Sequence, residues 1–448
     1  MKRGPVVVVD NGASTVKLGV ANASASPQDV RTFPNAIIRS KGDKKTYFGQ
    51  EFDECRDFSS LHYRLPFEKG FVVDWDAQKS IWDGIFTEQV LGVDPTESSL
   101  LITEPYFNLP NLQDTYDQFI FEEYEFQAYY RCPPAALIPH GHLFTRRGLP
   151  TPECVIIVDS GFSFTHVVPM INGVIEWSAV KRVDVGGKLL TNHLKELVSF
   201  RQWNMMDETH VMNDVKEACC YVSLRFGEDL EKCQAGPRNN PIVQEYILPD
   251  FSTNKRGRVR QPEEIIADSD QVLYMGNERF SVPEILFRPD DIGFDQAGVA
   301  GAVAQSIAFL PEELQGMFWA NIGLIGGSTK FPGYPERLLH ELRPLAPVEF
   351  EVYIYESQDA ILEAYRSAMS LAKLVKFNNY VVTREEYLES GINACRRKFK
   401  DWRSTEKEKE TGKGRREREE ERKPSPPPAP AAKPVKTRTR TVSAVKRR

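Results

Sequence analysis

The sequence predicts an α/β protein in which two similar domains face each other across a ligand cleft. Residues 6–19 read VVVVDNGASTVKLG and residues 155–168 read VIIVDSGFSFTHVV, so one pattern occurs twice. Each copy is followed by segments with helical spacing of apolar residues. The chain has 448 residues, which is long enough for two domains. A cleft between two such domains is a common place for a ligand.

Each copy of the pattern predicts a strand, a tight turn and a returning strand. In the first copy four valines run into Asp10-Asn11-Gly12, and Asn-Gly is the strongest short hairpin signal. The next residues, STVKLGVA, alternate as a second strand would. In the second copy, Asn172-Gly173 marks a further hairpin after FTHVVPMI. Both halves of the chain are therefore expected to begin with hairpins.

Helical patterns follow each set of strands. Ile81, Ile85, Phe86 and Val90 fall on one face of a helix predicted over WDAQKSIWDGIFTEQVL, residues 75–91. The segments LLTNHLKELVSF and VMNDVKEACCYVSLRF have similar spacing. We predict two halves, approximately residues 1–150 and 151–399.

Two segments break this alternation. Residues 251–271, FSTNKRGRVRQPEEIIADSDQ, are polar and charged, which predicts a surface insertion. Residues 400–448 hold 17 basic and 8 acidic side chains and a proline-rich stretch, which predicts a disordered tail. Its last residues suit nuclear import or contact with DNA phosphate, and a merely solubilising tail is the alternative.

Outside the basic tail, the net charge of the chain is strongly negative. The remaining 399 residues carry 40 basic and 55 acidic side chains, which argues against broad nucleic-acid binding and suits either solubility or basic partners. No apolar run approaches the ~20 residues of a membrane span. The N-terminal valine run stops at four, well short of a signal-peptide core, so secretion is not expected. Seven cysteines without a C-x-x-C pair predict reduced thiols in an intracellular protein with no zinc site.

The two turns form a candidate phosphate clamp, since successive backbone N–H groups of a glycine-containing turn bind phosphate. Asp10 and Asp159 end the leading strands and are candidate outer-shell ligands of Mg²⁺, and Lys17 is a candidate phosphate contact. Ordinary hairpins are the alternative, and the repetition leaves the two interpretations evenly balanced. Gly326-Gly327 would let the backbone approach a bound nucleotide closely, and an ordinary glycine turn is the alternative. Lys216-Glu217 suits either a ribose or base contact or a solvated helix face.

The ordered motifs of this chain resemble the actin family, which shares its core with sugar kinases and the large heat-shock chaperones. The matching segments run from about residue 5 to 399: DNGASTVKLGVA, VDSGFSFTHVVP, KRVDVGGKLLTNHL, NDVKEACCYVSL, GNERFSVPEILFRP, GLIGGSTKFPGYPERL and VTREEYLESGINACRRKF. The resemblance implies the actin-like ATPase fold, with a mixed five-stranded sheet in each half and a chain that returns to the first half near its C-terminus. It also implies these nucleotide-binding residues: Asp10, Gly12, Lys17, Asp159, Gly161, Gly186, Lys216, Glu217, Gly326 and Gly327.

The sequence departs from actin at positions that the resemblance links to ATP hydrolysis. In actin's pattern Asp-Asn-Gly-Ser-Gly, the last two residues are replaced here by Ala13 and Ser14, which removes a hydroxyl donor. An aspartate that follows the second turn in actin is replaced by Phe162. The water-positioning glutamine is absent from residues 133–144, where a histidine at 140 or 142 or Gly141 stands. The resemblance thus implies binding of ATP with Mg²⁺, or an empty cleft, and no catalytic residues. A Gly-Gly near the C-terminus is replaced by Tyr365-Arg366, which is expected to narrow the cleft.

Where the sequence differs from actin, it most resembles nuclear actin-related proteins. This resemblance is strongest in residues 46–83, 101–126 and 180–208. This implies a non-catalytic subunit of an SWR-type chromatin-remodelling complex, which exchanges a core histone for its variant and so regulates transcription. The implied partners are the other subunits and, through them, the nucleosome or histones. The implied location is the nucleus, with the cytoplasm also open. An ATP-hydrolysing, filament-forming protein and a small-molecule kinase are the alternatives.

No homopolymer is expected. The stretch between Ile38 and Tyr47 is shorter than the actin loop that inserts into a neighbouring subunit of the filament. The region of actin's apolar plug carries Asp290 and Asp291 near its tip, and burying two unpaired carboxylates is costly.

Overall fold

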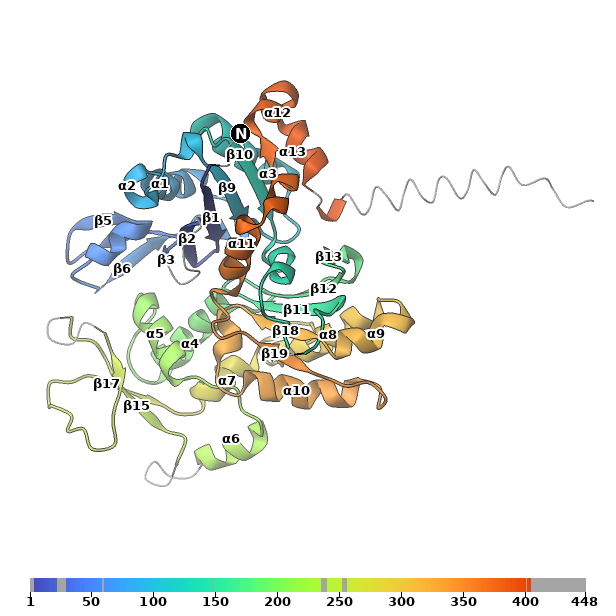
Figure 1. Cartoon of the computed structure of the whole chain (residues 1–448). Coiled ribbons are helices and arrows are strands. Elements are labelled where there is room, and N and C mark those ends of the chain that lie inside the picture. The colour runs from blue at the N-terminus through green and yellow to red at the C-terminus, as the bar shows by residue number, and fades with distance from the viewer. Residues whose placement is uncertain are drawn as a thin grey trace, which may run out of the picture. The chain divides into compact units, whose positions relative to one another are not determined.

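Two large mixed sheets organise the chain in the computed structural model (Figure 1). The structure describes residues 4–21, 30–58, 60–146, 148–234, 240–251, 256–399 and 401–403. The chain divides into two units, Met1–Asp401 and Trp402–Arg448, and the fold and the site lie within the first. The predicted tail from residue 404 onward and residues 252–255 of the predicted insertion lie outside the described residues.

The sheet of the first half is built around the first repeat. The strand β1 pairs antiparallel with β2 and parallel with β9, and β9 pairs parallel with β10. In spatial order the strands are β20 (Val382–Thr383), β10 (Ala128–Cys132), β9 (Ser99–Thr103), β1 (Val6–Asn11), β2 (Thr15–Ala21) and β3 (Arg31–Pro34).

The sheet of the second half repeats this arrangement. A hairpin of β11 and β12 is followed by β18 and β19, which add parallel to β11 in turn. The strands are β13 (Val174–Ile175), β12 (Thr165–Ile171), β11 (Cys154–Ser160), β18 (Ile322–Ile325) and β19 (Ile354–Glu356), with β14 (Lys181–Val183) beside β12. The predicted α/β class is confirmed, and each sheet has one short strand beyond the five expected.

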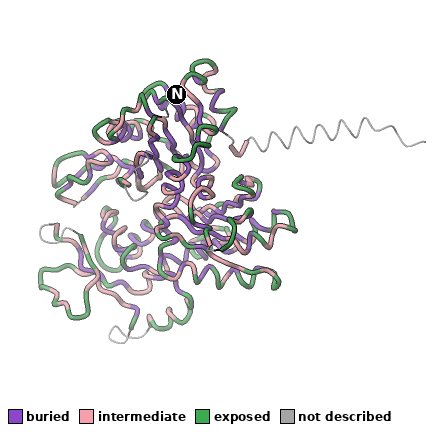
Figure 2. The backbone as a smooth tube through the Cα atoms, in the orientation of Figure 1, coloured by how far each residue is buried: buried purple, intermediate pink, exposed green. Residues whose placement is uncertain are grey.

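Continuous apolar runs form β1 and β11 because each is a central strand with a core on both faces. Val7 and Val9 of β1 pack into one core of the first half, whereas Val6 and Val8 pack into the other. In β11 the residues alternate in the same way between two cores of the second half. Figure 2 shows that buried backbone follows these strands.

The helices of the first half are α1 (Trp75–Ile85), α2 (Glu88–Leu91) and α3 (Pro110–Gln118), joined late in the chain by α11 (Glu363–Lys373), α12 (Arg384–Ser390) and α13 (Ile392–Lys398). The single helix predicted over residues 75–91 is two helices, because Thr87 accepts a hydrogen bond from the Val90 N–H and starts a new one. Late in the chain, α11 packs on β1 and β2, and β20 pairs with β10 (Figure 1).

The helices of the second half are α4 (Gly187–Arg201), α5 (Thr209–Cys219), α6 (Phe226–Gln234), α7 (Glu278–Glu284), α8 (Val299–Ala308), α9 (Glu312–Trp319) and α10 (Tyr334–Leu345). The helical pattern from residue 211 to 226 ends at Cys219. The next backbone N–H groups, of Tyr221 and Val222, bond to the carbonyls of Arg279 and Pro332 instead of continuing the helix.

Three small sheets and several short helical turns complete the fold. The sheets comprise β4 (Ile37–Ser40), β5 (Lys45–Phe48) and β6 (Leu61–Arg64); β7 (Phe67–Glu68) and β8 (Phe71–Val72); and β15 (Gln244–Ile247), β16 (Arg258–Val259) and β17 (Val272–Met275). The turns are η1 (Gly49–Glu54), η2 (Pro95–Glu97), η3 (Phe119–Glu123), η4 (Pro134–His140), η5 (Trp177–Ala179), η6 (Pro289–Ile292), η7 (Gly327–Lys330) and η8 (Val375–Asn379). Within the described residues, no helix combines the length and apolar character needed to cross a bilayer.

Candidate functional site

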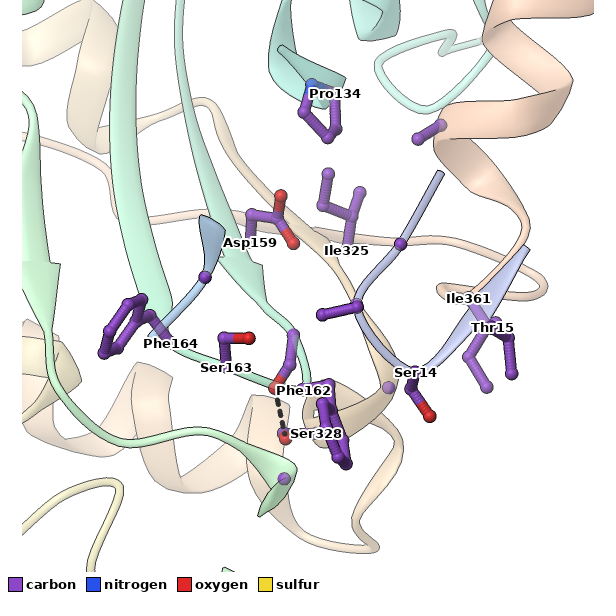
Figure 3. A pocket seen from close by; sticks show the side chains of 18 of the residues that line it. Ser14, Thr15, Pro134, Asp159, Phe162, Ser163, Phe164, Ile325, Ser328 and Ile361 are labelled. Carbon is purple, nitrogen blue, oxygen red and sulfur yellow. Dashed lines mark hydrogen bonds between the residues drawn. The ribbon is translucent and has the colours of Figure 1, made fainter. Parts of the chain in front are cut away.

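A cleft of about 740 Å³ lies between the two halves. Both repeated turns line it, together with the β7–β8 hairpin and the start of α4 (Figure 3). Nine of the ten predicted site residues line this cleft: Asp10, Gly12, Lys17, Asp159, Gly161, Lys216, Glu217, Gly326 and Gly327. The structure therefore brings together residues that are more than 300 positions apart in the sequence.

An internal ion pair occupies the first turn. Asp10 lies opposite Lys17 in the β1–β2 register, and their Oδ2 and Nζ atoms are 3.0 Å apart with both side chains buried. The Thr103 hydroxyl donates to Asp10 Oδ1 at 2.8 Å and accepts from the Asn11 N–H at 2.9 Å. Both Asp10 oxygens thus have protein partners.

A carboxyl and an imidazole occupy the corresponding positions of the second turn, where Asp159 lies opposite His166. The Tyr106 hydroxyl donates to Asp159 Oδ2 at 2.8 Å and accepts from the Ala135 N–H at 3.1 Å. Burial raises the pKa of Asp159 to about 6, and nearby Asp10 acts in the same direction, whereas the bond from Tyr106 opposes the shift. Burial lowers the pKa of His166 to about 3, so this imidazole is neutral at physiological pH.

The residues after the second turn put aromatic surface into the cleft. Phe162, Ser163 and Phe164 all line it, and Figure 3 shows the ring of Phe162 near Ser328 and the loop that carries Ser14. Ala13 also lines the cleft. At the two departures from the actin pattern, the cleft wall therefore offers a ring and a methyl group instead of a carboxylate and a hydroxyl.

Gly186 lies behind the cleft wall and is not among the lining residues. A Cβ atom at this position would come within 2.6 Å of the Phe162 carbonyl oxygen. The neighbouring Gly187 N–H donates to the Gly161 carbonyl at 3.0 Å, and the Lys188 N–H donates to that of Phe162 at 2.9 Å. Gly186 thus allows α4 to pack directly against the second turn.

The ammonium group of Lys216 is satisfied by the protein itself. This buried group donates to Asn213 Oδ1 at 2.8 Å, Thr191 Oγ1 at 2.9 Å and the Gly187 carbonyl at 3.4 Å, and burial lowers its pKa. Asn213 Nδ2 in turn donates to Glu217 Oε1 at 2.7 Å. Lys216 ties α5 to α4 beneath the cleft and has no remaining proton for a ligand.

Gly326 is required where two neighbouring strands end. Its φ is +91°, and a Cβ there would lie 2.4 Å from the Ser160 carbonyl oxygen. Other residue types rarely adopt this conformation, and the close approach excludes a side chain. Gly327 follows at the start of η7 and faces Ile361.

The expectation about Tyr365 is wrong, and the segment that lacks the glutamine lies almost entirely outside the lining of the cleft. Of η4, only Pro134 lines the cleft, whereas the His140 ring lies 6.2 Å from that of Tyr380 and burial lowers its pKa to about 4. His142 is exposed and does not line the cleft either. Tyr365 does not narrow the cleft, since it is fully buried in the core between α11 and the first sheet.

Four contributors were missed in the sequence: Thr103, Tyr106, Thr191 and Asn213. Each holds a predicted site residue in place, but their roles depend on contacts that local patterns do not reveal. The sequence pattern pointed to the strand ends, to Lys17 and to Lys216-Glu217, but not to the side chains that hold them in place.

The residues of the cleft fit a nucleoside polyphosphate better than a directly ligated metal. Among the described residues no group of three or more His, Cys, Asp or Glu side chains is placed to hold an ion. Glycine-containing turns from both halves line the cleft, and the first turn requires Gly12 because a Cβ there would lie 2.9 Å from the Thr15 carbonyl oxygen. Asp10 and Asp159 suit water-mediated contacts to a hydrated cation.

Comparisons with known proteins agree on one family. A model of the actin family matches residues 1–400. The chain is 52% identical over 421 residues to "Actin-like protein ARP6" of Cryptococcus neoformans, covering 89% of this chain and 85% of that protein. It is 37% identical over 398 residues to "Actin-related protein 6" of Drosophila melanogaster, covering 88% and 99%. It is 39% identical over 394 residues to "Actin-like protein ARP6" of Yarrowia lipolytica, covering 88% and 97%.

Proposed function

Because the chain belongs to the actin family, has the actin-like ATPase fold and groups with the proteins named actin-related protein 6, we propose that it is a non-catalytic subunit of a nuclear chromatin-remodelling complex. The complex exchanges a core histone for its variant in nucleosomes, and this exchange regulates transcription. The similarity to a protein named actin-like protein ARP6 supports the proposal, since it extends through most of the chain.

Phe162 is the single observation that carries the non-catalytic part of the proposal. Cleavage of a terminal phosphate needs a positioned metal, an aligned water and donors for the developing charge. Phe162 lines the cleft with its ring near Ser328 and the loop that carries Ser14 (Figure 3), at a sequence position where actin has an aspartate that helps to hold the shell of the metal. Ala13 provides no hydroxyl donor, and η4 contributes only Pro134 to the wall.

The cleft retains features that support nucleotide binding. The turns around Gly12 and Gly161 would hold phosphates, with the Lys17–Asp10 ion pair beside the first turn. Asp10 and Asp159 would hold waters of a Mg²⁺ ion. When bound, magnesium nucleotide supplies polyphosphate charge and its counter-ion. A ligand that binds only the folded chain stabilises it by mass action.

The proposed partners are the other subunits of the complex and, through them, nucleosomes or histones. The acidic body supports this, because residues 1–399 carry 15 more acidic than basic side chains. Such a surface attracts basic proteins and repels nucleic-acid phosphate. The proposed location is the nucleus.

Two measurements test the proposal. Affinity purification of the tagged chain from nuclear extract should recover a large complex with chromatin-remodelling subunits, and isolated monomer or filaments alone would contradict it. Denaturing the purified protein should release any bound ATP unhydrolysed, and a single-turnover assay should show no conversion. Stoichiometric formation of ADP within minutes would favour the ATP-hydrolysing alternative.

A further inference from the structure

Three aromatic rings connect the two halves of the chain at the edge of the cleft. Phe52 in η1 and Phe58 before β6 belong to the small sheet of the first half, and His210 lies in the first turn of α5 in the second half. The Phe58 and His210 rings are stacked, with centroids 5.5 Å apart and an interplanar angle of 16°. The Phe52 ring meets both of them edge-on, at 5.4 Å and 5.9 Å.

The rings are anchored on both sides. Phe52 and Phe58 pack with the buried core of the small sheet, so they are extensions of a rigid element. On the other side, Glu208 accepts a hydrogen bond from the Ser60 N–H, and His210 lies 4.0 Å from Asp214 one turn along α5. The small sheet and α5 are neighbours in Figure 1.

A second set of contacts joins the halves deeper in the cleft. Lys188 of α4 pairs with Glu68 of β7 at 3.1 Å. The turn after Glu68 lies against the second phosphate turn, since a Cβ at Gly70 would be 3.0 Å from the Phe164 ring. Both groups of contacts are made by the protein alone.

The two buried lysines of the cleft also have internal partners. Lys17 is paired with Asp10, and Lys216 donates to three acceptors. In a closed cleft, unpaired buried ammonium groups would repel each other and favour opening or a bound anion. Because both are satisfied, closure leaves no buried lysine charge that needs a polyphosphate.

We propose that Phe52, Phe58 and His210 form an aromatic latch that keeps the cleft closed without a ligand. Opening the cleft separates Phe52 and Phe58 from His210 and exposes all three rings to water. An aromatic pair changes such an equilibrium on the order of 3–10-fold beyond its buried area. The latch acts whether or not the cleft binds nucleotide, so a failed nucleotide assay leaves it intact.

Hydrogen exchange of the ligand-free full chain tests the latch. The protein is treated with apyrase and EDTA, and exchange is followed by mass spectrometry in peptides that contain residues 11–16 and 160–165. Phe58→Ala and His210→Ala should each raise exchange in both peptides about 3–10-fold, because either change removes the stacked pair. The double variant should exceed the larger single effect only slightly. His210→Phe should restore slow exchange.

The control is Phe200→Ala on α4, an aromatic residue of the same half that is 91% exposed, and it should leave both peptides unchanged. Unchanged exchange in Phe58→Ala and His210→Ala would overturn the latch, and so would effects that multiply in the double variant. If Phe58→Ala unfolds the small sheet, seen as fast exchange in β4 and β6, His210→Ala decides alone.

Discussion

Arg131 and Arg396 show how one helix places two aspartates in opposite environments. Arg131 binds Glu104 at 2.7 Å and Asp117 of α3 at 2.9 Å, and all three side chains are buried. One turn earlier on α3, Asp114 pairs with the half-exposed Arg396 of α13. Both are arginine–aspartate ion pairs, but the Arg131–Asp117 pair is shielded from water whereas the Arg396–Asp114 pair is in contact with it.

Arg131→Met should lower the free energy of unfolding by about 3–5 kcal/mol, because it leaves two buried carboxylates without their cation. Arg396→Met should cost less than about 1 kcal/mol, since exposed pairs contribute little. Urea titration of both variants measures the difference. Equal losses would show that Arg131 contributes no more than a surface pair.

Asp159→Asn should remove a pH-dependent cost of folding. Burial raises the pKa of the folded carboxyl to about 6, whereas the ordinary pKa of an aspartate is 3.8. Its contribution to stability is therefore complete below about pH 4 and lost as the pH rises through 6. Relative to the wild type, the variant should gain about 2–3 kcal/mol between pH 4 and pH 7. Urea titrations at both pH values measure this gain. A gain that falls as the pH rises would contradict the sign.

At the scale of elements, α1 begins at a residue with two roles. The Asp74 side chain accepts from the Ala77 N–H at 3.1 Å, which caps the helix, and binds Arg64 of β6 through two hydrogen bonds of 2.6 and 2.8 Å. The cap therefore fixes both the start of α1 and its position beside the small sheet.

Asp74→Ala should lower stability by about 1–2 kcal/mol, because a helix N–H loses its partner and Arg64 loses its carboxylate. The matched control is Asp76→Ala, an exposed residue in the first turn of the same helix, which should stay within about 0.5 kcal/mol. Thermal unfolding of both variants compares them. A larger loss from Asp76 would show that charge near the helix start, not the cap, matters.

The hairpins could be predicted from the sequence, whereas the supports of the site could not. Asn172 and Gly173 both have positive φ, as the Asn-Gly signal predicts. Thr103, by contrast, reaches Asp10 only because β1 and β9 pair in parallel with Val9 opposite Ile102. That register joins residues 93 positions apart, and no local pattern specifies it. The break in the helix before Thr87 was missed for a related reason, since apolar spacing continues across it.

At the scale of the whole molecule, both large sheets and their cores lie within Met1–Asp401. Removing residues 405–448 should therefore change the melting temperature by less than about 2 °C, which corresponds to less than ~1 kcal/mol for a protein of this size. Scanning fluorimetry measures the shift. A drop of more than about 5 °C would contradict the prediction, and unchanged nuclear accumulation of the shortened chain would exclude an import role for the segment.

The purified chain should not polymerise. The turn between β4 and β5 spans only residues 41–44, and Asp290 and Asp291 are exposed on η6. Burying these carboxylates between copies without partners would cost several kcal/mol. Ultracentrifugation in salt with magnesium ATP should leave the protein in the supernatant. Sedimenting polymer would overturn this expectation.

The position of α11 has a consequence for how the chain is made. During synthesis Val6 and Val8 leave the ribosome first, but the residues that cover this face of β1, Tyr365 and Met369, are made some 360 positions later. Until then the first sheet cannot complete its core, and apolar strand surface remains exposed while the second half is translated. The first half thus depends on the end of the chain, and we expect nascent chains to require chaperone binding that completed molecules do not.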